Sequence, residues 1–163
     1  MAIEIERKFL IKRIPKDKIE YSHYIKQGYI VSDKHKAIRI RQKKDDFFIT
    51  IKGNKTGISR FEFEYKIPKN DADQLFKNFC KESIIEKTRH YIKHKGHTWE
   101  LDVFHGENEG LIVAEIELKS EEETFPLPEW VDYEVTFQEK YYNMNLIKSP
   151  FKNWPESLET QLN

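Results

Sequence analysis

Apolar and charged residues alternate one by one along much of this chain, and that alternation constrains its fold more than any other feature. A period of two is the period of a β-strand, whose successive side chains point to opposite faces of a sheet. In the segment 60–66, Phe61, Phe63 and Tyr65 alternate with charged residues without a break. The pattern predicts a mainly β protein with about nine strands, over residues 3–9, 25–31, 37–41, 47–52, 60–66, 86–93, 99–103, 114–119 and 133–136.

Three segments interrupt the alternation and favour helices. Asn70 or Asp71 is predicted to cap a helix that runs to about Ser83, because the apolar residues between them recur at helical spacing. Shorter helices are expected at 15–19 and 141–147. A few helices among many strands make the expected class mainly β with an α+β character.

Glycine marks the expected turns, which lie at 53–57, 94–97 and 106–110. Short turns favour antiparallel pairing between consecutive strands. The first of these segments superficially suggests a phosphate loop, but the chain contains no G-x-x-x-x-G-K-[ST] motif. We therefore interpret it as a hairpin loop after Lys52, with contact to a ligand as the alternative.

Composition bounds the class of protein. A chain of 163 residues corresponds to one domain. The single cysteine, Cys80, excludes internal disulfides, and the segment 1–4 lacks the basic start of a signal peptide, so we expect a cytoplasmic protein. The longest apolar run, 111–114, is too short to cross a membrane. Because 28 basic and 28 acidic residues cancel, non-specific binding to nucleic acid is not expected.

The charged residues are grouped by sign. Side chains two positions apart share a strand face, and like charges there repel, so solvated faces normally mix signs. This chain has four acidic and two basic pairs: Glu4 with Glu6, Glu62 with Glu64, Glu100 with Asp102, Glu115 with Glu117, Arg39 with Arg41, and Lys87 with Arg89. For a single strand, a solvated face over a sandwich core explains the alternation. Over the whole chain, the pairs favour a closed antiparallel barrel with the charged face inside.

A barrel interior lined in this way needs a charged ligand, because unpaired buried charges are costly. Paired carboxylates are hard oxygen donors that suit Mg²⁺ or Mn²⁺. Clusters of arginine and lysine suit phosphate oxygens. The two together indicate a polyphosphate substrate.

The order of the charged motifs resembles the CYTH superfamily, also called the triphosphate tunnel metalloenzymes. The segment 4–8 fits the E-x-E-x-K signature of that family. It is followed in order by the remaining motifs, which are Gln27-Gly28-Tyr29, Arg39-Ile40-Arg41, Thr50-Ile51-Lys52, Arg60-Phe61-Glu62-Phe63-Glu64, Lys87-Thr88-Arg89, Trp99-Glu100-Leu101-Asp102-Val103-Phe104, Ala114-Glu115-Ile116-Glu117-Leu118 and Glu134-Val135-Thr136. The length and order are most similar to the short bacterial tripolyphosphatase-like branch.

This resemblance implies one CYTH-type domain over 1–163, with a core at about 3–147 and a C-terminal tail at 148–163. The implied fold is a closed eight-stranded antiparallel β-barrel that forms a tunnel, with flanking helices. The implied activity is the hydrolysis of inorganic tripolyphosphate by an enzyme that depends on Mg²⁺ or Mn²⁺ and cleaves a phosphoric anhydride.

The resemblance also implies a role for each charged residue. The expected metal ligands are Glu4, Glu6, Asp102, Glu115 and Glu117. Glu62 and Glu64 would act in catalysis through a second metal or a metal-bound water. The expected triphosphate-binding residues are Lys8, Arg39, Arg41, Lys52, Lys87 and Arg89, and Lys8 would also position the attacking water.

Several alternatives remain open at this stage. A class IV adenylate cyclase or a thiamine or nucleoside triphosphatase would use the same lining, and a non-catalytic polyphosphate-binding module is the alternative of another class. A zinc site formed by His90, His94, His97 and Cys80 is disfavoured by their spacing. Tyr29 is expected to pack within its strand, with a place at the tunnel mouth as the alternative. The sequence fits a monomer or a homodimer.

Overall fold

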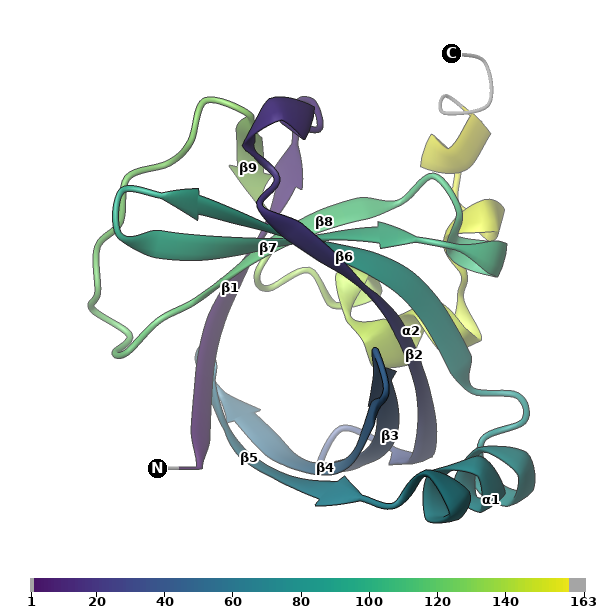
Figure 1. The fold of residues 1–163 in the computed structure, drawn as a ribbon. Helices are drawn as coiled ribbons and strands as arrows, with labels where there is room; N and C mark the ends of the chain where they lie inside the picture. Colours follow the sequence, from purple (N-terminus) through teal and green to yellow (C-terminus); the bar gives the residue numbers. More distant parts are fainter. Residues whose placement is uncertain (1, 159–163) are drawn as a thin grey trace.

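A nine-stranded antiparallel sheet, closed on itself as a barrel, forms the body of the protein in the computed structural model, which describes residues 2–158 (Figure 1). The strands are β1 (Ile3–Ile11), β2 (Tyr21–Ser32), β3 (Ala37–Lys43), β4 (Asp46–Thr56), β5 (Ser59–Ile67), β6 (Ile84–His94), β7 (His97–Phe104), β8 (Ile112–Glu117) and β9 (Val131–Glu134). They follow the order β5-β4-β3-β2-β6-β7-β8-β1-β9. The predicted mainly β class is confirmed.

The ring closes where β1 pairs with β5. The first part of β1 lies antiparallel to β5, with Glu4 opposite Arg60. The middle of β1 pairs with β8, with Lys8 opposite Glu115, and its end pairs with β9. Eight strands therefore form the closed barrel, and β9 extends the sheet beside the end of β1. The expected eight-stranded antiparallel barrel is confirmed.

The helices differ in detail from the prediction. Helix α1 (Lys69–Phe79) follows Pro68, and no side chain caps its start, so the expected cap at Asn70 or Asp71 is wrong. The helix ends before Ser83 because the Ser83 amide instead donates a hydrogen bond to the carbonyl of Cys80 in a turn. The other helices are η1 (Lys16–Lys18), η2 (Gly106–Asn108), η3 (Glu139–Tyr141), α2 (Asn143–Lys148) and η4 (Phe151–Asn153), so the single helix expected at 141–147 is divided between η3 and α2.

The expected hairpin loop at 53–57 is also wrong in part. Strand β4 continues to Thr56, and only Gly57 and Ile58 form the turn to β5. Gly57 has a φ of +62°, a left-handed conformation that glycine adopts at little cost. The register between β4 and β5 shifts after Lys52, so residues assigned to a loop by their composition belong to an irregular strand.

Two apolar clusters cover the outside of the barrel. Helix α1 packs over β2, β3 and β4, where Phe76 and Cys80 join Ile40 in one buried cluster. On the other side, Trp99 and Trp130 meet edge to face with ring centroids 5.8 Å apart. Both tryptophans are almost fully buried and pack against the outside of the barrel wall.

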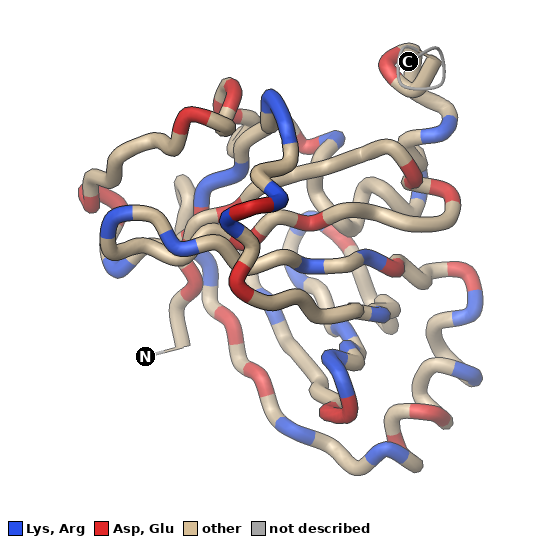
Figure 2. Tube along the Cα trace, turned by 45° about the horizontal axis from the view of Figure 1, so that its top comes forward, with Lys and Arg blue, Asp and Glu red and all other residues tan. Residues whose placement is uncertain are grey.

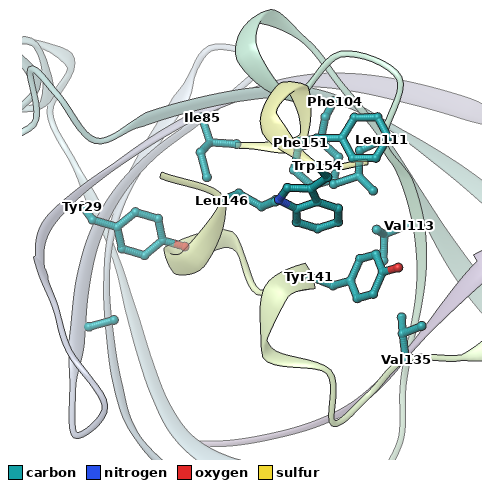
Figure 3. Close-up of a cluster of buried hydrophobic side chains, with 11 residues drawn as sticks. Tyr29, Ile85, Phe104, Leu111, Val113, Val135, Tyr141, Leu146, Phe151 and Trp154 are labelled. Carbon is teal, nitrogen blue, oxygen red and sulfur yellow. The ribbon is translucent and has the colours of Figure 1, made fainter. Parts of the chain in front are cut away.

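A third apolar cluster joins the barrel wall to the segment after β9 (Figure 3). Tyr141, Leu146 and Trp154 come from this segment and pack together with Ile85 and Val113 of the wall. Ile85 precedes Lys87 by two positions on β6, and Val113 precedes Glu115 by two on β8, so each pair lies on one face of its strand. Along both strands the inner face therefore changes from apolar to charged. Of the expected tail at 148–163, residues 159–163 lie outside the described part of the chain.

No helix in the described range 2–158 is both long and apolar enough to span a bilayer.

Candidate active site

The barrel wall brings the predicted like-charge pairs together on its inner face, and charged residues lie along its strands as well as in the loops (Figure 2). One cavity of about 210 Å³ is lined by ten of the predicted site residues, namely Glu4, Glu6, Arg39, Arg41, Lys52, Glu62, Glu64, Arg89, Glu115 and Glu117. Lys8 lines an adjoining cavity of about 40 Å³, and Lys87 and Asp102 are buried in the wall beside Arg89. Glu100, which also lines the larger cavity, completes the acidic pairs.

Lys8 is held between two carboxylates. Its Nζ lies 2.6 Å from Glu115 Oε1 and 3.5 Å from Glu6 Oε1. Burial opposes the charge on Lys8, but Glu115 and Glu6 outweigh it and raise the pKa of Lys8 above its usual value. The pKa of Glu115 is well below its usual value, because Lys8 and Arg89 outweigh the cost of burying that carboxylate. The pair is therefore ionised.

Asp102 lies among the basic residues. Arg89 donates from Nε to Asp102 Oδ1 at 2.7 Å and from Nη2 to Oδ2 at 2.9 Å. Lys87 donates to the same Oδ2 at 2.8 Å. Burial lowers the pKa of Lys87 to about 8, although Asp102 counteracts this effect. Both oxygens of Asp102, a fully buried residue, are therefore occupied by basic side chains.

The two arginines of β3 are positioned by uncharged residues that the charge pattern did not single out. Gln27 Oε1 accepts hydrogen bonds from Arg41 Nε at 3.2 Å and from Arg41 Nη2 at 3.0 Å. Thr50 Oγ1 accepts one from Arg39 Nη2 at 3.3 Å. Gln27 and Thr50 are fully buried on the inner face. Both residues belong to the family motifs named above and alternate there with apolar residues, and this alternation could have identified them from the sequence.

The basic side chains crowd one another on this part of the inner face. Burial, followed by the charges of Arg39 and Arg89, lowers the pKa of Arg41 to about 10. Arg39 Nη2 lies 3.7 Å from Glu64 Oε2, which neutralises only part of this charge. A cluster of guanidinium groups whose charges disfavour one another would be stabilised by an anion.

The carboxylates crowd one another as well. Lys52 Nζ contacts Glu4 at 3.1 Å and Glu62 at 3.0 Å. Glu117 has no basic partner among residues 2–158, and burial with the charges of Glu4 and Glu100 raises its pKa to about 7. Burial and neighbouring carboxylates also raise the pKa of Glu6. These groups would be stabilised by a cation.

The acidic side suits a divalent metal by its donor chemistry. Several carboxylates face one cavity, and at least Glu117 lacks a compensating base in the described chain. Within the described residues, no three acidic, histidine or cysteine side chains already converge as a ready coordination sphere. Lysines hold some of the carboxylates instead, as Lys52 holds Glu4, so the acids fit Mg²⁺ or Mn²⁺ once these ion pairs rearrange.

Tyr29 has both of the positions considered for it. It is buried in the cluster around Leu146 and Trp154, and it also lines the 40 Å³ cavity beside Lys8. Its hydroxyl lies 3.5 Å from Gln27 Nε2, at the limit of a hydrogen bond. Tyr29 therefore connects the apolar end of the barrel with its charged end.

The sequence profile of the CYTH domain matches residues 2–145. The chain belongs to the CYTH family. It is 44% identical to an inorganic triphosphatase of Acetivibrio thermocellus, over 96% of this chain and all of that protein. It is 34% identical to an inorganic triphosphatase of Nitrosomonas europaea, over 90% of this chain and 97% of that protein. The family resemblance inferred from the charged motifs is confirmed.

Solved structures of other proteins share the fold. The crystal structure of the inorganic triphosphatase NE1496 is similar with a TM-score of 0.67 and 32% identity, covering 91% of this chain and 97% of that one. A putative adenylate cyclase from Bacillus halodurans is similar with a TM-score of 0.57 and 19% identity, covering 75% and 84% of the two chains. At that identity the second likeness concerns the fold alone.

Proposed function

We propose that this CYTH protein is an inorganic triphosphatase, which hydrolyses a phosphoanhydride bond of tripolyphosphate with the help of a divalent metal. The observation that carries the proposal is the division of the inner face into a crowd of arginines and a crowd of carboxylates around one cavity. The 44% and 34% identical relatives are both inorganic triphosphatases, and this chain covers almost their whole length.

The arginines and Lys87 hold the phosphate chain in this proposal. Arg39 and Arg41 are oriented by Thr50 and Gln27, so their donors are already arranged before substrate binds. Such preorganised donors stabilise the charge that develops on the transferring phosphoryl group. Asp102 is assigned to this basic side as a positioning residue, in place of the metal-ligand role that the resemblance implied.

The carboxylates that would hold the metal are Glu4, Glu6, Glu115 and Glu117. A bound Mg²⁺ or Mn²⁺ would supply charge withdrawal from phosphate oxygens and a lower pKa for water. Lys52 and Lys8 contact carboxylates in this structure and would bind phosphate oxygens in the loaded enzyme.

Glu62 and Glu64 orient the attacking water. Burial opposes ionisation of Glu62, but hydrogen bonds with Glu4 and the charge of Lys52 lower its pKa below the usual value. An ionised carboxylate accepts hydrogen bonds from water and removes a proton as the water attacks. Lys8, on the same inner face, assists in placing the water. The bond that breaks joins a bridging oxygen to phosphorus, and no covalent enzyme intermediate is required.

The test is a panel of substrates assayed for released phosphate with Mg²⁺ and with Mn²⁺. We expect rapid cleavage of tripolyphosphate, slow cleavage of pyrophosphate, and almost none of simple monoesters. ATP and thiamine triphosphate should be slower than tripolyphosphate, because an organic group must be accommodated at a tunnel mouth. EDTA should abolish activity.

Other outcomes of this panel would overturn the proposal. Rapid conversion of ATP to cyclic AMP would favour an adenylate cyclase. Binding of tripolyphosphate without turnover, with either metal present, would favour a polyphosphate-binding module. Full activity in EDTA would exclude the metal-dependent mechanism.

A further inference from the structure

An irregularity in β4 turns one more lysine toward the tunnel. Lys52 pairs with Glu62, and Lys55 pairs with Arg60, so β4 contains one more residue than β5 between these two pairs. In a regular strand, residues three positions apart face opposite sides of the sheet. The extra residue is a β-bulge that restores Lys55 to the inner face, and bulges commonly redirect a side chain next to a functional site.

Arg60 holds this bulge in place. Its Nε and Nη2 donate hydrogen bonds to the carbonyl oxygen of Gly53 at 3.1 and 2.8 Å. Arg60 stands two residues before Glu62 and shares its inner face. The guanidinium group therefore fixes the part of the backbone that turns Lys55 inward.

Within residues 2–158, the ammonium group of Lys55 has no carboxylate in ion-pair contact. Its Nζ is buried, and no group within the described residues accepts a hydrogen bond from it. It lies 4.4 Å from the ring centroid of Tyr142, which is a cation–π contact. Burial, and next the charge of Lys8, lowers the pKa of Lys55. By contrast, Lys8, Lys52 and Lys87 each contact a carboxylate.

Lys55 lies between the inner cavities and a third cavity, which we take as one mouth of the tunnel. It lines the 40 Å³ cavity together with Lys8 and Lys52, and that cavity shares Arg39 and Lys52 with the 210 Å³ cavity. On its other side, Lys55 and Tyr142 also line a third cavity of about 470 Å³. A phosphate chain that extends from the larger inner cavity into the smaller one would bring one of its ends to Lys55.

We propose that Lys55 binds the terminal phosphoryl group of a linear polyphosphate at this mouth, with Arg60 as the residue that positions it. This inference rests on the proposed triphosphatase function and names a subsite within it. A phosphate oxygen would replace the Tyr142 ring as the partner of the ammonium, since a charge-assisted hydrogen bond is stronger than a cation–π contact. The subsite would favour chains of three or more phosphates over pyrophosphate.

The test is calorimetric titration with tripolyphosphate, pyrophosphate and orthophosphate in EDTA, where binding is measured without turnover. Lys55→Met removes the charge and keeps the aliphatic stem, and Lys55→Arg keeps the charge. Lys77→Met, at an exposed position of α1 outside the barrel, is the matched control. We expect Lys55→Met to weaken tripolyphosphate binding about tenfold or more, while pyrophosphate binding changes less than about twofold. Lys55→Arg should retain most of the affinity, and Lys77→Met all of it.

Wild-type affinity of Lys55→Met for tripolyphosphate would overturn the proposal. A loss confined to orthophosphate would also overturn it, because Lys55 would then hold only the released product. If Lys55→Met does not fold, Lys55→Gln replaces it, and the same two results decide.

Arg60→Lys should raise the KM for tripolyphosphate with little change in kcat. Failure of the triphosphatase function is recognised separately, as a wild-type protein that binds tripolyphosphate through Lys55 but does not cleave it.

Discussion

Arg89 and Asp102 face each other across β6 and β7 and form a two-pronged ion pair, in which Nε and Nη2 of the arginine bind separate oxygens of the carboxylate. Both side chains are buried. The planar guanidinium group is thereby fixed in one orientation, with its Nη1 directed to Glu100. The pair explains how a strong cation can be kept inside a barrel wall and still be presented to an anion.

Asp102→Asn should therefore act on the basic side of the tunnel. Two buried cations would lose their shared anion, so we expect the free energy of unfolding to fall by about 3 kcal/mol or more. Substrate affinity should fall as well, whereas the Mg²⁺ concentration that gives half-maximal activity should stay within about twofold. Urea unfolding and Mg²⁺ titrations measure these effects, with Asp132→Asn on β9 as the control. A large shift in the Mg²⁺ requirement alone would identify Asp102 as a metal ligand.

Glu117→Gln should stabilise the metal-free fold at alkaline pH and at the same time lower activity. In the folded chain the pKa of Glu117 is raised from 4.5 to about 7, so ionisation of this carboxyl destabilises the fold as the pH rises between these values. We expect the metal-free variant to be more stable than wild type at pH 8 and equal to it at pH 4. Activity should fall about 100-fold or more, because a proposed metal ligand is lost. Thermal unfolding and phosphate release test this, with exposed Glu122→Gln as the control. A destabilised variant with normal activity would contradict the assignment.

Metal activation should depend on pH through the same carboxyl. Below pH 7 most Glu117 side chains carry a proton that a metal ion must displace, so apparent Mg²⁺ affinity should rise with pH and level off above 7. One displaced proton corresponds to at most about a tenfold change per pH unit. Half-activating Mg²⁺ concentrations measured from pH 5.5 to 8.5 show the slope, and Glu117→Gln should flatten it. An equal slope in the variant would place the proton on another group.

Gly28→Ala should destabilise the contact between β2 and the residues that follow α1. A Cβ at this position would lie 2.7 Å from the Cβ of Cys80 and 2.9 Å from Cδ1 of Ile84, so the backbones must separate. We expect a loss of about 1–3 kcal/mol, typical of overpacking in a core. Gly53→Ala is the matched control, since its new Cβ would lie at an ordinary 3.6 Å from Phe61. Equal melting temperatures for the two variants would contradict this account.

The alternation of residues predicted which charged side chains face inward, because the two-residue period depends only on the local strand geometry. It could not predict which charges meet. Asp102 shares a face with Glu100, yet it is the pairing of β6 with β7 that brings it to Arg89. That pairing is set by tertiary packing, so the alternation alone could not show that Asp102 meets basic residues. Its metal-ligand role was implied by the family resemblance and stays a prediction.

The pattern also missed features that break or lie outside the charge alternation. Lys55 was predicted to lie in a glycine-containing loop. Instead it belongs to an irregular part of β4, where Arg60 donates a hydrogen bond across the hairpin to the carbonyl of Gly53. Gln27 carries no charge and was therefore not assigned to the site. No local signal indicated that the segment carrying Trp154 joins an apolar cluster with the barrel wall.

The junction between β1 and β5 has a consequence for how the barrel moves. The paired register between these strands spans only Ile3 to Ile5, whereas β4 and β5 pair over most of their length. Lys52 reaches across this junction from β4 to Glu4 on β1, so one ion pair reinforces a short ladder of backbone hydrogen bonds. Local opening begins where few such bonds must break. Amide protons at this junction should consequently exchange with solvent before those of the longer strand pairs, and a ligand that draws Glu4 away from Lys52 would change that exchange rate first.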